Sequence, residues 1–500
     1  MTWLRLKLPP IPLHELTVYN LLTAASALTK QDESHIVSLK TGTCQNQIMR
    51  DFKHISRRKR PVWLRLFSRR RTDPLNSFKK LTEPTPDRKW LRYLLPALAI
   101  LLAAYPIGSL LFSARNAVSS VNRTPPKATK ISPYGELTDA QSFRLGTDAL
   151  STSRYEGEHL VAPLADGGKM VYTFDQELQT RVTSVLESFH IPYGAFVAIE
   201  PKTGRILAMA GYSAADPSWA SQSCYNLYPM ASLFKIVTAA AALEQKKVNA
   251  STVLSFRGRL TSENPKYWDA PPTRKGKQGQ QMNLAMAMGK SVNPVFGRLA
   301  SDVVGRDSLM AAAVLFGFNQ PLFPETPVVP SIAQEPRDQM DLRRMGAGLS
   351  HEVKISPLHA AALMAAIAND GTLMKPYLAE EIRNGKGVEI YSPKAHPLRR
   401  LVSHESASEL TRMLSTSVNS GTSRKAFHDR RGRPKLATID IAAKTGSING
   451  TNPAGHYSWF AAYAPINDPQ IALVALVVNS DKWRIKASYV GEQALEAFFK

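Results

Sequence analysis

Apolar and polar residues follow one another along the chain in patterns that predict one folded domain over residues 169–500. The domain opens with a strand at residues 170–174, and Asp175 is a suitable N-cap for a helix with its apolar residues on one face. Amphipathic or apolar runs predict further helices at residues 282–288, 294–304, 308–316, 357–369, 405–418 and 488–499. Short apolar runs predict strands at residues 195–199, 205–210, 439–444, 459–464 and 471–479.

Strands therefore lie near both ends of the domain, with helices between them. The first two of these strands are joined by Pro201-Lys202-Thr203-Gly204, which is a hairpin signal. This order predicts an α+β layered fold, in which one antiparallel sheet takes strands from both chain ends and is flanked by helices.

The most unusual stretch is the run from Tyr228 to Glu244, which is almost free of charge but contains Ser232 and Lys235. Pro229 marks a loop and the Ala-rich residues after it favour a helix, so Ser232 and Lys235 are expected one turn apart on the same face. Burial among apolar residues disfavours a charged lysine and lowers its pKa. A neutral Lys235 can take the proton of Ser232 and make it a nucleophile.

An uncharged run at residues 93–112 predicts one transmembrane helix, because 20 residues span about 30 Å as a helix, the thickness of a bilayer core. A buried helix of a soluble domain is the alternative. Lys and Arg are denser before the run than after it, which predicts a cytoplasmic N-terminus and an external domain. Residues 1–92 are then a basic, mostly disordered cytoplasmic tail, and residues 113–168 a linker.

The formal net charge of +23 is concentrated in this tail, where residues 1–92 hold 19 Lys/Arg against 7 Asp/Glu. Membrane topology and contact with anionic lipid headgroups explain such basic runs. No nucleic-acid-binding motif or metal-ligand spacing accompanies them, so neither a nucleic acid nor a metal is expected. Cys44 and Cys224 lie on opposite sides of the predicted span, so no intramolecular disulfide is expected.

Two short motifs can complete a site around Ser232, namely Ser291-Val292-Asn293 and Lys444-Thr445-Gly446-Ser447. Each motif is unspecific alone. Other copies are Ser-x-x-Lys at residues 77–80, Lys-Thr-Gly at 40–42 and 202–204, and Ser-x-Asn at 262–264 and 417–419. Order and setting favour the first set, because Lys444 is expected to end an apolar strand and Ser291 to lie between two helices, where polar side chains can face a cleft.

In this order, the three motifs resemble the signature set of the active-site serine penicillin-binding proteins and related β-lactamases. The chain from about Met170 to Lys500 resembles the transpeptidase domain of the penicillin-binding proteins, also at residues 173–179, 199–209, 366–371 and 458–460. The first two of these segments look most like the bifunctional class A branch. About 55 residues separate the predicted span from the domain, too few for a glycosyltransferase domain. Ala231 and Ala443 stand where the family usually has glycine, and Ser447 where threonine is common.

The resemblance implies a serine-type D-Ala-D-Ala transpeptidase that cross-links peptidoglycan stem peptides through an acyl-enzyme. Ser232 is implied as the nucleophile and Lys235 as its base, with Ser291 and Lys444 passing a proton to the leaving D-alanine. The backbone N–H groups of Ser232 and Ser447 are implied as the oxyanion hole.

Substrate binding is implied for the remaining motif residues. Asn293 would hold the substrate amide, and in the segment Thr445-Gly446-Ser447 the two hydroxyls would bind the terminal carboxylate. The resemblance also implies covalent inhibition by β-lactams, no cofactor, and a separate glycosyltransferase as partner. It implies a single-pass protein of the bacterial inner membrane with an extracytoplasmic catalytic domain.

Two other functions stay open. Water in place of an amine at the second step makes a D,D-carboxypeptidase or a β-lactamase. The small size and the basic tail also fit a catalytically weak scaffold or β-lactam sensor of a wall-synthesis complex.

Overall fold

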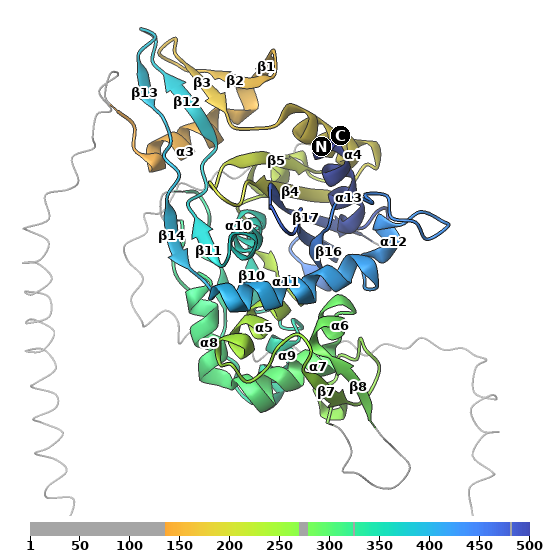
Figure 1. The fold of residues 1–500 in the computed structure, drawn as a ribbon. Helices are drawn as coiled ribbons and strands as arrows, with labels where there is room; N and C mark the ends of the chain where they lie inside the picture. The colour runs from red at the N-terminus through yellow and green to blue at the C-terminus, as the bar shows by residue number, and fades with distance from the viewer. Residues whose placement is uncertain (1–135, 270–278, 324–325, 481–482) are drawn as a thin grey trace, which may run out of the picture. The chain divides into compact units, whose positions relative to one another are not determined.

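The computed structural model describes residues 136–269, 279–323, 326–480 and 483–500 (Figure 1). The predicted tail, the predicted span at 93–112 and the first part of the predicted linker lie outside these residues. Within them, no helix is both long enough and apolar enough to cross a membrane.

A five-stranded antiparallel sheet forms the centre of the domain. Its strands, in spatial order, are β15 (Ala442–Thr451), β16 (Ala454–Ala464), β17 (Ile471–Asn479), β4 (Tyr193–Ile199) and β5 (Ile206–Tyr212). The sheet joins strands from both ends of the domain, which confirms the predicted α+β architecture.

Helices cover both faces of this sheet (Figure 1). On one face, α4 (Gln176–Ser188) and α13 (Ala487–Phe498) pack against alternate strand residues such as Phe196. On the other face lies α10 (Pro357–Ala368), which is buried along almost its whole length against residues such as Val197. The Asp175 side chain accepts a hydrogen bond from the N–H of Leu178, so the predicted N-cap of α4 is confirmed.

Helical segments beside this sheet carry Lys235 and Asn293, whereas residues 444–447 lie on β15 of the sheet itself. These helical segments are α5 (Lys235–Glu244), α6 (Leu284–Gly289), α7 (Asn293–Arg298), a π-helical turn (Leu299–Val304), α8 (Arg306–Leu315), α9 (Gln339–Gly346), α11 (His404–Asn419) and α12 (Arg424–Phe427). Three small sheets lie among them. In one, β10 (Val353–Ile355) pairs with β6 (Tyr228–Pro229) and β9 (Ile332–Ala333); in the others, β7 (Val253–Phe256) pairs with β8 (Gln280–Asn283) and β11 (Thr372–Met374) with β14 (Pro397–Arg400). The predicted helices are therefore present, with small shifts at their ends.

A second five-stranded sheet extends the domain to residues that the sequence assigned to the linker. It is formed by β1 (Arg154–Glu156), β2 (His159–Pro163), β3 (Lys169–Tyr172), β12 (Ala379–Arg383) and β13 (Glu389–Tyr391), next to helix α3 (Asp139–Ala149). Residues 139–163 thus contain regular structure rather than linker. Short strands carry little local signal: β1 pairs with β2 and β2 with β3, and only β3 pairs with β12, more than 200 residues away in the sequence.

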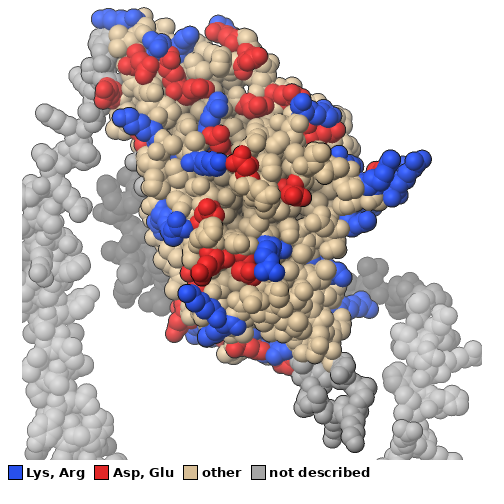
Figure 2. Space-filling model, viewed as in Figure 1, with Lys and Arg blue, Asp and Glu red and all other residues tan. Residues whose placement is uncertain are grey.

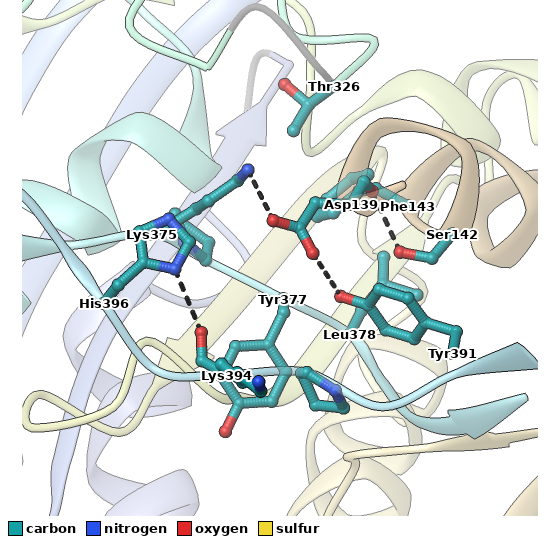
Figure 3. Close-up of a pocket in the computed structure, with 12 residues that line it drawn as sticks. Asp139, Ser142, Phe143, Thr326, Lys375, Tyr377, Leu378, Tyr391, Lys394 and His396 are labelled. Carbon is teal, nitrogen blue, oxygen red and sulfur yellow. Dashed lines mark hydrogen bonds and ion pairs between the residues drawn. The ribbon is translucent and has the colours of Figure 1, made fainter. Parts of the chain in front are cut away.

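A small cavity lies between α3 and this second sheet, and it shares no lining residue with the predicted active-site motifs. Figure 3 shows Lys375 and Tyr391 pointing at the Asp139 carboxylate, at 2.8 and 3.0 Å. Partial burial alone would raise the pKa of Asp139, but the two hydrogen bonds and the Lys375 charge outweigh burial and lower that pKa. The cluster thus ties α3 to the strands beside it.

Charges of both signs are interspersed over the face drawn in Figure 2, with one basic projection at its right edge. There, Figure 1 draws the loop after α12, in which Arg430, Arg431 and Arg433 are exposed. Asp429 accepts hydrogen bonds from the backbone N–H groups of Arg431 and Arg433, which holds this turn in shape.

The predicted strand at residues 439–444 is displaced in the structure. β15 begins at Ala442 and continues to Thr451, so Lys444 lies near the start of the strand and not at its end. The prediction followed the apolar run, whereas the pairing with β16 extends through the polar motif, with Thr445 opposite Phe460 and Ser447 opposite Ser458. The whole Lys444-to-Ser447 motif therefore lies on an edge strand.

His359 of α10 is buried, and its two hydrogen bonds indicate that the imidazole is neutral. Its Nε2 lies 2.9 Å from the carbonyl oxygen of Phe316, which only accepts, so Nε2 carries the proton. Its Nδ1 then accepts from the Ser331 hydroxyl at 2.6 Å. Burial lowers the pKa of His359 to about 4.

Because of His359, the free energy of unfolding is expected to fall by roughly 3 kcal/mol as the pH drops from about 6.5 to 4. Between these values the unfolded chain binds a proton at this histidine and the folded chain does not, so acid favours unfolding. Urea denaturation at several pH values measures the effect. His359→Gln should flatten the dependence and the exposed His159→Gln should not; equal slopes in both variants would contradict the assignment.

Candidate active site

Ser232 and Lys235 lie side by side where β6 leads into α5. Ser232 lies in a short 3₁₀ turn (Ala231–Phe234), and Lys235 is the first residue of α5. Both side chains are buried, and Lys235 Nζ lies 2.8 Å from Ser232 Oγ. The sequence-based prediction that the two groups touch is confirmed.

The other two contacts of Lys235 define how its amine can act. Nζ donates to Oδ1 of Asn293 at 2.8 Å and to the backbone carbonyl of Ala347. Both oxygens only accept, and a neutral amine has two N–H groups to satisfy them. Its lone pair is then directed to the Ser232 hydroxyl, which is the geometry of a general base.

Burial, reinforced by the positive charge of Lys444, lowers the pKa of Lys235 well below its ordinary value. Burial also lowers the pKa of Lys444, to about 7. Two buried amines, one beside Ser232 and one beside Ser291, thus favour proton transfer close to neutral pH, where an ordinary lysine stays charged.

The Ser291 motif meets Lys444 across the site. Ser291 lies between α6 and α7, and its hydroxyl accepts a hydrogen bond from Lys444 Nζ at 2.8 Å. Its backbone φ of 56° is in the left-handed region, which a serine adopts only when its surroundings hold it there. Asn293 begins α7, and its Nδ2 donates to the carbonyl of Ser262 at 3.3 Å. The Ser291 loop is therefore held in place from two sides.

Strand β15 packs against the Ser232 turn at Gly446. A Cβ atom on Gly446 would lie 3.2 Å from that of Ala231, a close contact that shows how tightly the strand and the turn pack. This contact places the exposed Ser447 next to the turn and leaves the free edge of β15 open. Thr445 hydrogen bonds through its Oγ1 to Thr422 Oγ1 at 2.6 Å.

The structure brings the eight predicted site residues into three adjacent groups, and the other motif copies do not form such a site. Lys202 pairs with Asp468 at the surface, Ser417 is buried against Ser423, and Ser262 offers its backbone to Asn293. The copies at residues 40–42 and 77–80 lie outside the described residues. Sequence reasoning missed Ala347 and Thr422, because neither belongs to a motif and both are distant in the sequence from their partners.

The backbone at Ala231 and at Gly348 shapes the turn that holds Ser232. Ala231 has a φ of 54°, which explains why glycine is the usual residue there, and the strain of an L-residue costs about 1–2 kcal/mol. Gly348 has a φ of 68°, and a Cβ on it would lie 2.3 Å from the Ala231 oxygen and 2.8 Å from Ser232 Cα. The loop after α9 therefore presses directly on the turn that holds Ser232.

Gly348→Ala is expected to lower the free energy of unfolding by about 3 kcal/mol, from left-handed strain and overpacking together, and to slow acylation of Ser232. Gly157→Ala is the matched control, because Gly157 has a φ of 66°, close to that of Gly348, but open space around it. This control should lose only about 1 kcal/mol and keep its acylation rate. Denaturation curves and penicillin labelling measure both effects, and equal losses in the two variants would contradict the close packing.

Comparison with known proteins agrees with this geometry. The family model of the penicillin-binding protein transpeptidase domain matches residues 194–500. The peptidoglycan D,D-transpeptidase PbpA of Mycolicibacterium smegmatis is 30% identical over 320 residues, which cover 57% of this chain and 61% of that protein. Stage V sporulation protein D of Bacillus subtilis is 26% identical over 375 residues, covering 68% of this chain and 54% of that protein.

Among solved structures, penicillin-binding protein A of Mycobacterium tuberculosis superposes with a TM-score of 0.56 at 26% identity, covering 67% of this chain and 83% of that one. Its imipenem acyl-enzyme complex gives a TM-score of 0.54 at 26% identity, with 67% and 80% coverage.

The chain spans about three fifths of the length of the PbpA proteins that it matches. These relatives do not single out the class A branch that two sequence segments suggested. At the level of the family, the motif geometry, the fold and the matched residues agree, and the chain belongs to the penicillin-binding protein transpeptidase family.

Proposed function

We propose that this chain is a peptidoglycan D,D-transpeptidase that cross-links stem peptides through an acyl-enzyme on Ser232. The observation that carries the proposal is the buried Lys235 amine, 2.8 Å from Ser232 Oγ, with two acceptors for its N–H groups.

In the first step, Ser232 Oγ bonds to the carbonyl carbon of the penultimate D-alanine, and its proton passes to Lys235 Nζ. The bond from this carbon to the terminal D-alanine nitrogen breaks. That nitrogen leaves as an amine after taking a proton from Ser291, and Lys444 replaces the proton on Ser291. The 2.8 Å distance between Lys444 Nζ and Ser291 Oγ supports this relay.

The edge strand β15 supplies the substrate contacts. The hydroxyls of Thr445 and Ser447 would bind the terminal carboxylate, and the backbone N–H groups of Ser232 and Ser447 would stabilise the oxyanion, each by roughly 3 kcal/mol. Asn293 would hold the substrate amide. Its Oδ1 accepts a hydrogen bond from Lys235, so one amide group would link the base to the substrate.

In the second step, the amine nitrogen of a neighbouring stem peptide bonds to the acyl carbon, and the bond from this carbon to Ser232 Oγ breaks. Lys235 returns its proton to Ser232 Oγ, and Lys444 takes through Ser291 the proton that the amine loses, which closes the cross-link and restores the site. β-Lactams mimic the donor and would stay on Ser232, as the imipenem acyl-enzyme of the M. tuberculosis protein supports. No cofactor is needed for either step.

The proposal includes the predicted topology. Residues 93–112 would anchor the protein in the bacterial inner membrane, with residues 1–92 in the cytoplasm and the catalytic domain outside. Glycan strands would come from a separate glycosyltransferase. Within the family, residues 173–179 and 199–209 remain the segments that favour a relation to class A.

Product analysis with purified protein tests the function. A transpeptidase incubated with pentapeptide donor and an amine acceptor forms dimers, and its penicilloyl adduct persists for minutes or longer. Release of D-alanine without dimers would identify a D,D-carboxypeptidase, and loss of the adduct within seconds a β-lactamase. Either result would overturn the proposal.

A further inference from the structure

Thr422 contacts the site from the corner between α11 and α12 and belongs to none of the three motifs. Its Oγ1 lies 2.6 Å from Thr445 Oγ1 and 3.3 Å from the carbonyl oxygen of Gly289. Its backbone N–H donates to the same Gly289 carbonyl at 3.0 Å. Thr422 thus links β15 to the end of α6, two residues before Ser291.

This corner is held in a fixed position. A Cβ on Gly421 would lie 2.2 Å from the Gly289 oxygen, so the two chain segments are in direct contact. Ser423 is buried, donates its N–H to the Ser417 carbonyl at 3.1 Å and shares a hydroxyl hydrogen bond with Ser417. The Thr422 hydroxyl is therefore presented to Thr445 by a rigid backbone.

The direction of the hydrogen bond between the two threonines follows from what a substrate requires. A carboxylate only accepts hydrogen bonds, so Thr445 has to give it the single hydroxyl proton that it owns. Thr445 can then only accept from Thr422. The Thr422 proton is free to do this, because the Gly289 carbonyl already receives the Thr422 N–H and lies farther from the hydroxyl.

We propose that Thr422 is a positioning residue of the carboxylate subsite, which donates to Thr445 and so directs the Thr445 hydroxyl proton toward the terminal carboxylate of the donor peptide or β-lactam. The inference rests on the proposed function of Thr445. The hydrogen bond from Thr422 to Thr445 Oγ1 also polarises the Thr445 hydroxyl and makes it a stronger donor.

The test compares the acylation rates of penicillin G and of its methyl ester, which lacks the carboxylate, on the full-length protein. Thr422→Val keeps the shape of the side chain and removes its hydroxyl. It should lower the ratio of the penicillin G rate to the methyl ester rate about fivefold. Thr422→Ser should restore the ratio. Thr416→Val is the matched control, because its hydroxyl donates to the carbonyls of Ala285 and Met413 at the same corner and does not touch Thr445.

A double-mutant cycle separates positioning from a general packing effect. Since Thr422 acts through Thr445, the Thr422→Val/Thr445→Val variant should show the same ratio as Thr445→Val alone. Unchanged discrimination in Thr422→Val, or losses that multiply in the double variant, would overturn the inference. A different result would contradict the proposed function itself, namely a wild-type protein that is not acylated on Ser232.

Discussion

Ser232→Ala is expected to abolish covalent labelling by a fluorescent penicillin. The methyl group cannot form an ester, and the surrounding hydrogen-bond donors cannot replace the nucleophile. Removing one buried hydroxyl leaves Lys235 with its contacts to Asn293 and Ala347, so the fold should persist. A gel of denatured, labelled protein measures the covalent adduct directly, and thermal unfolding checks the fold.

Ser223→Ala is a suitable control for this experiment. Ser223 is also buried, but its hydroxyl donates to the carbonyl of Ala220. It should label like the wild type, whereas an adduct on Ser232→Ala would show that another residue is the nucleophile.

The same variant separates an enzyme from a scaffold in cells. If wall synthesis survives Ser232→Ala but is lost when residues 1–92 are deleted, the scaffold or sensor function is correct. Loss of cross-linking with Ser232→Ala supports the transpeptidase.

Lys235→Met is expected to slow acylation by roughly 10²–10⁴-fold, the usual contribution of a general base. Methionine fills a similar volume but cannot take the Ser232 proton. It also leaves Asn293 Oδ1 and the Ala347 carbonyl without their donor, so a stability loss of about 1–3 kcal/mol accompanies the rate effect. Stopped-flow acylation and denaturation curves measure the two effects independently.

Thr238→Val distinguishes lost stability from lost catalysis. Thr238 lies one turn further along α5, and its hydroxyl donates to the Gly346 carbonyl at 3.0 Å, next to Ala347. This variant should lose stability but keep its acylation rate. An equal fall in acylation for both variants would mean that Lys235 acts through the packing of α5 and not as the base.

Prediction of the site from the sequence depended on order, because each motif occurs more than once. Helix propensity was sufficient to place Ser232 and Lys235 one turn apart, since contacts three residues apart are set by the local backbone. Strand ends were harder to predict. The boundary of β15 is decided by pairing with β16 and not by its own apolar residues, so the predicted end at Lys444 was wrong.

The strands of the two five-stranded sheets also differ in how easily the sequence reveals them. Apolar strands such as β17 are buried on both faces and are visible as continuous runs. By contrast, β1 and β2 are short, and the sheet that they form with β3 is completed by β12, which is distant in the sequence. For this reason residues 139–163 read as linker.

The sequence alone determined the α+β class, the family resemblance, and the local partner of the nucleophile, because these depend on periodicity and on residues close together in the chain. Only the tertiary structure decided what surrounds them. The contacts of Lys235 with Asn293 and Ala347, of Lys444 with Ser291, and of Thr445 with Thr422 join distant segments. Their burial shifts the lysine pKa values, and burial is a property of packed elements that local sequence patterns do not contain.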